Sequence, residues 1–78
     1  MKLEIITPEK KVFEGDILSV LVPGSNGQFE ILNNHASIVS NLNSGKVRVT
    51  NTKNENLFFE INGGVIEMQN NKIIVLAE

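Results

Sequence analysis

Hydrophobic and polar residues alternate with a period of two along most of the chain, a period typical of β-strands. In residues 2–7, Leu3 and Ile5 fall on one face while Lys2 and Glu4 fall on the other. Residues 46–50 alternate basic side chains with valine. Alternation of this kind, or a high density of β-branched residues, predicts strands at 2–7, 11–14, 17–22, 28–32, 46–50, 57–61, 65–69 and 72–76.

Residues 36–42 fit two structures. Ile38, Val39 and Leu42 would share one face of a helical turn, but the density of Val and Ile and the turn expected next, at Asn43-Ser44-Gly45, favour a strand. The pair Asn70-Asn71 separates two predicted strands and is typical of a type I′ hairpin turn, because Asn tolerates positive φ.

Four glycines are expected to have structural roles in turns. Gly24 and Gly27 flank Ser25-Asn26, and Gly63 and Gly64 are consecutive, so both pairs permit positive φ and close approach of the backbone. Neither pair is followed by a helix pattern or by the Lys-Ser/Thr of a phosphate-binding loop. We therefore expect turns at these positions and no phosphate site.

The pattern contains about eight to ten short strands and no segment typical of a long helix. It predicts an all-β fold, a small antiparallel β-sandwich or flattened barrel. With 78 residues, the chain is expected to form a single domain over 1–78. Hydrophobic residues make up 41%, with four Phe and no Trp or Tyr, so the core should be aliphatic.

Composition and charge exclude several classes of partner. The absence of Cys removes disulfides and thiolate chemistry and favours a reducing compartment. A net charge of -2 provides no basic field for nucleic acid. Glu4 and Pro8 interrupt any signal-peptide pattern, and the apolar runs are far shorter than the roughly 20 residues that span a bilayer. We expect a soluble chain without direct membrane insertion.

His35 is the only histidine, and it has no partners for chemistry. Glu30 is the only carboxylate within several residues of it, and no Gly-x-Ser-x-Gly elbow is present. We therefore expect no enzyme activity, metal or cofactor, and His35 is either a loop residue bonded to the backbone or an interface residue.

Two kinds of binding site also match the sequence poorly. A lipoyl- or biotinyl-type carrier would present a lysine at a hairpin tip, whereas Lys53 lies in a longer polar segment without Met or Asp beside it. Phe58 and Phe59 would face opposite sides of a strand with no basic cluster, so a nucleobase-stacking platform is not expected. One Phe should enter the core and the other should lie at the surface.

Residues 22–32, Val-Pro-Gly-Ser-Asn-Gly-Gln-Phe-Glu-Ile-Leu, are followed by His35-Ala36. This stretch resembles the amino-terminal β-sandwich of the epsilon subunit of F-type ATP synthases, called delta in mitochondria. The resemblance extends over all 78 residues and includes residues 3–9, 12–15, 62–67 and 72–78. The family usually reads Leu-Pro-Gly-His-Ala-Pro where residues 32–37 read Leu-Asn-Asn-His-Ala-Ser. Asn34 is therefore expected to supply any positive φ that the glycine provides.

The resemblance implies a non-catalytic central-stalk subunit that links the gamma subunit to the membrane c-ring and couples proton or sodium flow to ATP synthesis. It also implies a peripheral location at the cytoplasmic face of the inner (plasma) membrane. Matching positions imply contacts with the c-ring loops by Ser25, Asn26 and Gln28 and with the gamma subunit by Thr7, His35 and Ser40.

Many relatives have a two-helix carboxy-terminal region that restrains ATP hydrolysis and in some members binds ATP. These residues contain no counterpart of it, so the resemblance implies neither inhibition of ATP hydrolysis nor ATP binding for them. The residues alone leave an alternative open, a stand-alone β-sandwich module that binds a peptide or a carbohydrate. Such a module should expose a cluster of aromatic side chains.

Overall fold

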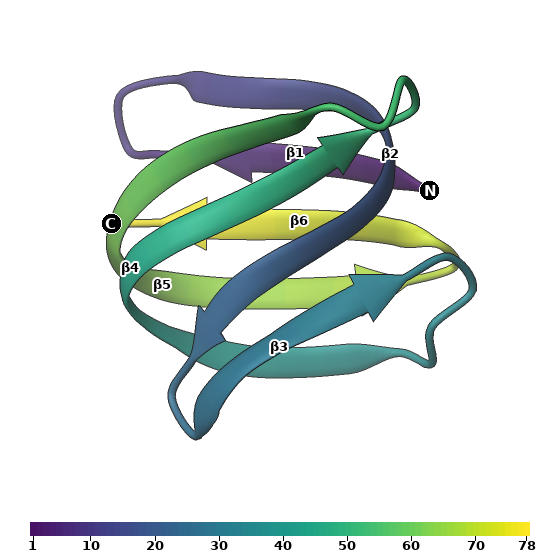
Figure 1. Ribbon diagram of the computed structural model, residues 1–78. Coiled ribbons are helices and arrows are strands. Elements are labelled where there is room, and N and C mark those ends of the chain that lie inside the picture. The colour runs from purple at the N-terminus through teal and green to yellow at the C-terminus, as the bar shows by residue number, and fades with distance from the viewer.

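The computed structural model describes residues 1–78 and contains six β-strands (Figure 1). They are β1 (Lys2–Ile6), β2 (Lys11–Gly24), β3 (Gly27–Leu32), β4 (Ile38–Asn51), β5 (Asn56–Gln69) and β6 (Lys72–Ala77). No segment forms a helix long and apolar enough to cross a membrane. The predicted all-β class is confirmed.

The strands follow the order β1-β6-β5-β4-β2-β3, and an additional β1–β2 pairing closes the first five into a small barrel. Strand β3 extends from β2 at the edge of this barrel. Every pairing is antiparallel except that of β1 with β6, the first and last strands, which lie side by side and run parallel (Figure 1). Strand β1 thus completes the flattened barrel by pairing with β2 on one side and with β6 on the other.

The structure has fewer and longer strands than the eight to ten that we expected. Strands β2, β4 and β5 are each 14 residues long, and each covers two of the short strands predicted from the sequence. All three bend along their length (Figure 1), and the register of β2 with β4 shifts between Ile17 and Ser19 and again between Leu21 and Gly24. Such irregularities bend a strand without ending it, which explains the difference for β2 and β4. The turn expected at Asn43-Ser44-Gly45 is accordingly wrong, because these residues continue β4.

Two of the four glycines lie at a turn, and the other two lie inside a strand. Gly24 and Gly27 oppose each other in the β2–β3 hairpin, and Gly27 has a φ of 119°, so this turn is confirmed. The turn expected at Gly63 and Gly64 is wrong, because both lie inside β5. Their φ values of 123° and 146° nevertheless confirm the predicted freedom at positive φ. They allow β5 to bend between layers while its pairing continues.

The core consists of aliphatic side chains that point inward from all six strands. Phe13 and Phe59 pack against this core, and their two rings contact each other edge to face, with centroids 5.6 Å apart. Phe59 is thus the core member of the Phe58-Phe59 pair, and Phe58 is the exposed member, as predicted. The buried core residues are Leu3, Ile5, Ile17, Val20, Val22, Ile31, Leu42, Val47, Val49, Ile61, Ile66, Met68, Ile73, Val75 and Ala77.

Asparagines occupy the left-handed turn positions. Asn70 and Asn71 have φ values of 53° and 60°, which confirms the predicted hairpin turn between β5 and β6. Asn34 has a φ of 65°, as expected for a residue that replaces glycine. In the ambiguous segment 36–42, residues 38–42 belong to β4, which confirms a strand there, and residues 36 and 37 lie in the loop before it.

Candidate interaction surfaces

Ser25, Asn26 and Gln28 lie at the exposed tip of the β2–β3 hairpin. The N–H and the hydroxyl of Ser25 both donate to the carbonyl oxygen of Asn41, at 3.0 and 3.2 Å. These two bonds fasten the tip to the first half of β4. The structure therefore brings the three residues predicted to face the c-ring together on one anchored polar projection.

His35 lies in the β3–β4 loop, and its side chain is exposed. Its N–H donates to Leu32 O at 3.2 Å, and its Nδ1–H donates to Ala36 O at 2.7 Å, because a carbonyl oxygen can only accept. The other ring nitrogen, Nε2, is then available to an external partner. Bonding of this loop histidine to the backbone is thus confirmed.

The structure does not cluster Thr7 with His35 and Ser40. Thr7 lies in the β1–β2 turn, where its hydroxyl both donates to Lys10 O and accepts from Lys10 N–H. Ser40 lies on β4 and is half-buried. Strands β6 and β5 lie between β1 and β4. Ser40 pairs with the buried Ile66, so its side chain points to the inner side of the sheet and away from the outer face of β5 and β6.

That outer face carries an apolar patch that the sequence analysis did not find. We call it the β5–β6 patch. Val39 and Leu76 are its most exposed members, at 70% and 53%. The register explains the patch, because outward positions meet across the strands. The patch consists of Ile6, Val39, Val65, Ile74 and Leu76. Leu76 lies between Ile6 and Val65, whereas Glu67 lies between Val39 and Ile74.

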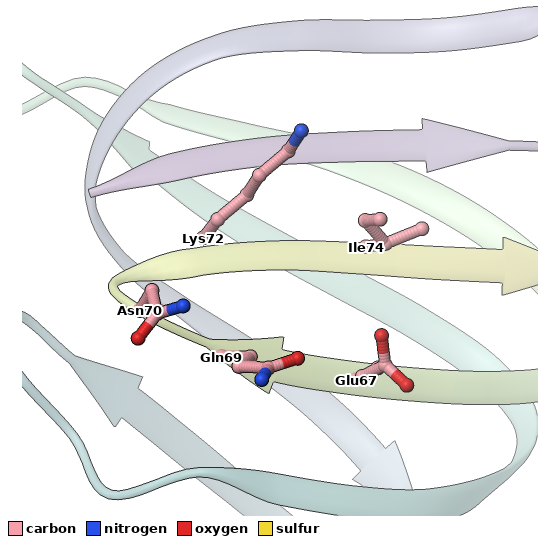
Figure 2. Close-up of a pocket in the computed structure, with 5 residues that line it drawn as sticks. All are labelled: Glu67, Gln69, Asn70, Lys72 and Ile74. Atoms are coloured by element: carbon pink, nitrogen blue, oxygen red, sulfur yellow. The ribbon is translucent and has the colours of Figure 1, made fainter.

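Two shallow hollows adjoin the β5–β6 patch and share Glu67 and Gln69. The first, of about 270 Å³, is also lined by Asn70, Lys72 and Ile74, and Figure 2 shows its side chains along β5, β6 and the turn between them. The second, of about 300 Å³, lies between β5 and the start of β4. Neither contains a nucleophile with an orienting base, and no group of His, Cys, Asp and Glu could hold a metal ion. These hollows can accept a protruding side chain of a partner.

An ion-pair cluster borders the same face and joins three strands. Glu4 on β1 contacts Lys11 on β2 at 2.7 Å and Lys72 on β6 at 3.6 Å. The hydrogen bond from Lys11 lowers the pKa of the Glu4 carboxyl, and the bond to Glu4 in turn raises the pKa of Lys11. Glu4 is therefore held ionised, a state suited to a structural role at the β2–β1–β6 junction.

Comparisons with known proteins identify the family of the chain. The family model for the ATP synthase Delta/Epsilon chain β-sandwich domain matches residues 1–78. The ATP synthase epsilon chain of Chlorobium limicola is 43% identical over 77 residues, which cover 99% of this chain and 88% of the relative. That of Chlorobaculum tepidum is 45% identical, with 97% and 86% covered. The epsilon chain of Protochlamydia amoebophila is 41% identical, and the match covers 97% of this chain but 52% of that protein.

Solved structures show the same fold. A chain of the Euglena gracilis mitochondrial ATP synthase, from a structure of OSCP, F1 and the c-ring, superposes with a TM-score of 0.91 at 14% identity, over 96% of this chain and 48% of its own length. A chain of the Tetrahymena thermophila mitochondrial ATP synthase, from its central stalk and c-ring, gives a TM-score of 0.79 at 19% identity, with 99% and 62% covered. The chain therefore belongs to the family of ATP synthase delta and epsilon chains, whose β-sandwich domain it spans.

Proposed function

We propose that the chain is a non-catalytic subunit of the rotor stalk of an F-type ATP synthase, which links the gamma subunit to the c-ring at the cytoplasmic face of the membrane. Its family and its similarity to epsilon chains support this function, and the solved relatives come from c-ring and central-stalk assemblies. The observation that carries the proposal is the uncovered β5–β6 patch on the outer face of these strands, close to the turn that holds Thr7, a residue expected near the gamma subunit.

The β5–β6 patch fits the gamma subunit as a protein partner. Apolar residues that remain exposed next to one another on a sheet commonly mark a protein interface. Val39 and Leu76 would be covered by apolar side chains of the partner, and the exposed ring of His35 would bond to a polar group of the partner through Nε2. Thr7, which directly follows β1, would then lie at the edge of the covered area.

The hairpin tip fits the loops of the c-ring. Ser25, Asn26 and Gln28 provide hydrogen-bonding groups without charge, which suits contact with polar loops. Strand β4 lies between the hairpin and the β5–β6 patch, and we expect the two partners to bind on either side of it. Because Ser25 is bonded to Asn41 on β4, force applied at the tip passes directly into the barrel.

The closed barrel suits a mechanical role. Its fifteen buried hydrophobic residues form one continuous core, and strands β1, β6, β5, β4 and β2 are joined around the full circumference. Densely packed cores have low compressibility and transmit strain. Torque received at the tip would reach the gamma-facing surface without deformation of the domain.

The alternative, a module for a peptide or a carbohydrate, requires exposed aromatic side chains. Only Phe58 among the four Phe is an exposed large side chain, and Phe13, Phe29 and Phe59 pack against the core. Phe58 is also covered on one side by Lys46, whose Nζ lies 5.7 Å from the ring centroid. The surface therefore favours the rotor function over this alternative.

Single-cysteine cross-linking tests the proposed function directly, since the chain has no native Cys. In a reconstituted, coupled complex, Gln28→Cys should form an adduct with the c subunit and His35→Cys an adduct with the gamma subunit. Lys53→Cys, in the exposed β4–β5 turn, serves as the control and should trap neither subunit. Absence of both expected adducts in a coupled enzyme would contradict the function.

A further inference from the structure

Asn71 makes hydrogen bonds that tie its turn to two distant parts of the chain. Its side-chain Nδ2 donates to Asn33 Oδ1 at 2.9 Å, and its Oδ1 accepts from the Asn34 N–H at 2.9 Å. Its backbone carbonyl accepts from the Lys2 N–H at 3.2 Å. One residue of the β5–β6 turn thus joins the β3–β4 loop and the start of β1.

The β3–β4 loop depends on this contact for its conformation. Residues 33–37 contain no proline, so the loop sequence does not restrict its own φ angles. The hydrogen bonds within the loop region are the local ones of His35, to Leu32 O and Ala36 O. The bonds to Asn71 are those that fix the loop relative to the rest of the barrel.

The chemistry of the contact is specific to an amide side chain. The loop offers one donor, the Asn34 N–H, and one acceptor, Asn33 Oδ1, and a single amide group satisfies both. Asn71 is half-buried, so its bonds are partly shielded from water, whereas Asn33 and Asn34 are exposed. Its own φ of 60° and the φ of 65° at Asn34 place both residues in the left-handed region that Asn tolerates.

We propose that Asn71 is a positioning residue for the interface: it holds Asn33 and Asn34 so that the loop presents His35 to the gamma subunit in one conformation. The identity of the partner rests on the proposed function, whereas the hold on the loop does not. A loop ordered before binding loses less conformational entropy when the partner arrives. If the loop is released, only part of the population is competent to bind, and the apparent Kd rises accordingly.

Asn71→Gly is the decisive variant, because glycine keeps the left-handed turn and removes both side-chain hydrogen bonds. Asn70→Gly is the matched control: residue 70 is in the same turn with a φ of 53°, and its side chain makes none of the bonds to the loop. Asn71→Asp keeps the acceptor for the Asn34 N–H but removes the donor to Asn33, so it should hold the loop better than Asn71→Gly does and less well than Asn71 does.

The first measurement is amide hydrogen exchange by NMR on the chain without partners. We expect the Asn34 and His35 amides to exchange at least about tenfold faster in Asn71→Gly, with no change in Asn70→Gly and an intermediate change in Asn71→Asp. The second measurement is affinity for purified gamma subunit, which should weaken about tenfold in Asn71→Gly only.

Unchanged exchange at Asn34 in Asn71→Gly would overturn the inference, whatever the partner. Faster exchange with unchanged affinity would also overturn it, because the loop would then not be positioned for binding. Failure of the unsubstituted chain to bind gamma subunit would contradict the proposed function, and the positioning role with it. Because this outcome is measured on the unsubstituted chain, it is distinguished from any effect of replacing Asn71.

Discussion

The carbonyl oxygen of Leu76 lies where a Cβ atom of residue 64 would have to be placed. Gly64 is paired with Ala77 across β5 and β6, and its φ of 146° is a conformation that side-chain-bearing residues rarely adopt. Backbone contact and backbone conformation therefore both require glycine. This contact lets β5 bend between the two layers of the barrel while it remains paired with β6.

Gly64→Ala should lower the free energy of unfolding by about 4 kcal/mol or more, because it combines a steric clash with an unfavourable φ. Gly27→Ala is the control that separates the two effects: its φ is 119°, but no atom lies within 4 Å of the added Cβ. Backbone strain alone should cost about 1 to 2 kcal/mol there. Urea unfolding of both variants measures the difference, and equal losses would contradict a role for the contact with Leu76.

The alternation of residues predicted most strand positions and their buried faces, because this period is a local property of the chain. It did not predict that the chain continues through Gly63 and Gly64 as a strand. Consecutive glycines are equally compatible with a turn and with a bent strand, and the choice depends on β6, which comes later in the sequence. This is one reason why the predicted strand count was too high, and the irregular register of β2 with β4 is another.

The candidate surfaces were predictable to different degrees. The hairpin with Gln28 and the loop with His35 follow from a contiguous motif. The β5–β6 patch depends on which outward residues meet across strands, as Leu76 meets Val65. The only local signal was the apolar run at residues 73–77, where inward and outward positions are both hydrophobic. Similarly, nothing local connects Asn71 with Asn33, which are 38 residues apart.

Val39→Lys should weaken binding to the gamma subunit at least about tenfold, because it places a charge in the β5–β6 patch that must be desolvated. Val39 is 70% exposed and lies opposite Glu67, so the variant should unfold within about 1 kcal/mol of the unsubstituted chain. Calorimetric titration with purified gamma subunit measures the affinity.

Leu18→Lys is the control for Val39→Lys. Leu18 is 46% exposed and lies on β2, outside the β5–β6 patch. It should change neither affinity nor stability appreciably. If Leu18→Lys weakened binding as much as Val39→Lys, the effect would reflect the added charge in general, and the assignment of this face would be wrong.

The pair Glu4–Lys11 should make stability depend on pH at both ends of the range. Because the folded pKa of Glu4 is lowered from 4.5, its contribution is present above 4.5 and is lost as the pH falls through the folded value. Because the folded pKa of Lys11 is raised from 10.5, its contribution is present below 10.5 and is lost as the pH rises through the folded value.

Glu4→Gln tests this linkage. The variant should be less stable than the unsubstituted chain between these limits, and the difference should shrink in strong acid and in strong base. It should also shrink at high salt, since both groups are partly exposed. Glu9→Gln, at an exposed position without an ion pair, is the control. Urea unfolding at several pH values checks the prediction, and parallel curves for Glu4→Gln and the unsubstituted chain would contradict it.

Millimolar ATP should leave the Tm of the chain unchanged. Both surface hollows are lined by Glu67, and Lys72 is the single cation that lines either of them, so a triphosphate would meet a carboxylate with little compensation. The glycines that could approach a phosphate are engaged elsewhere, Gly64 against β6 and Gly24 against Phe29. Ligand that binds the folded state raises the Tm in proportion to the logarithm of its concentration over Kd. Thermal unfolding with and without ATP therefore decides the matter, and a rise of several degrees would reveal a nucleotide site on this domain.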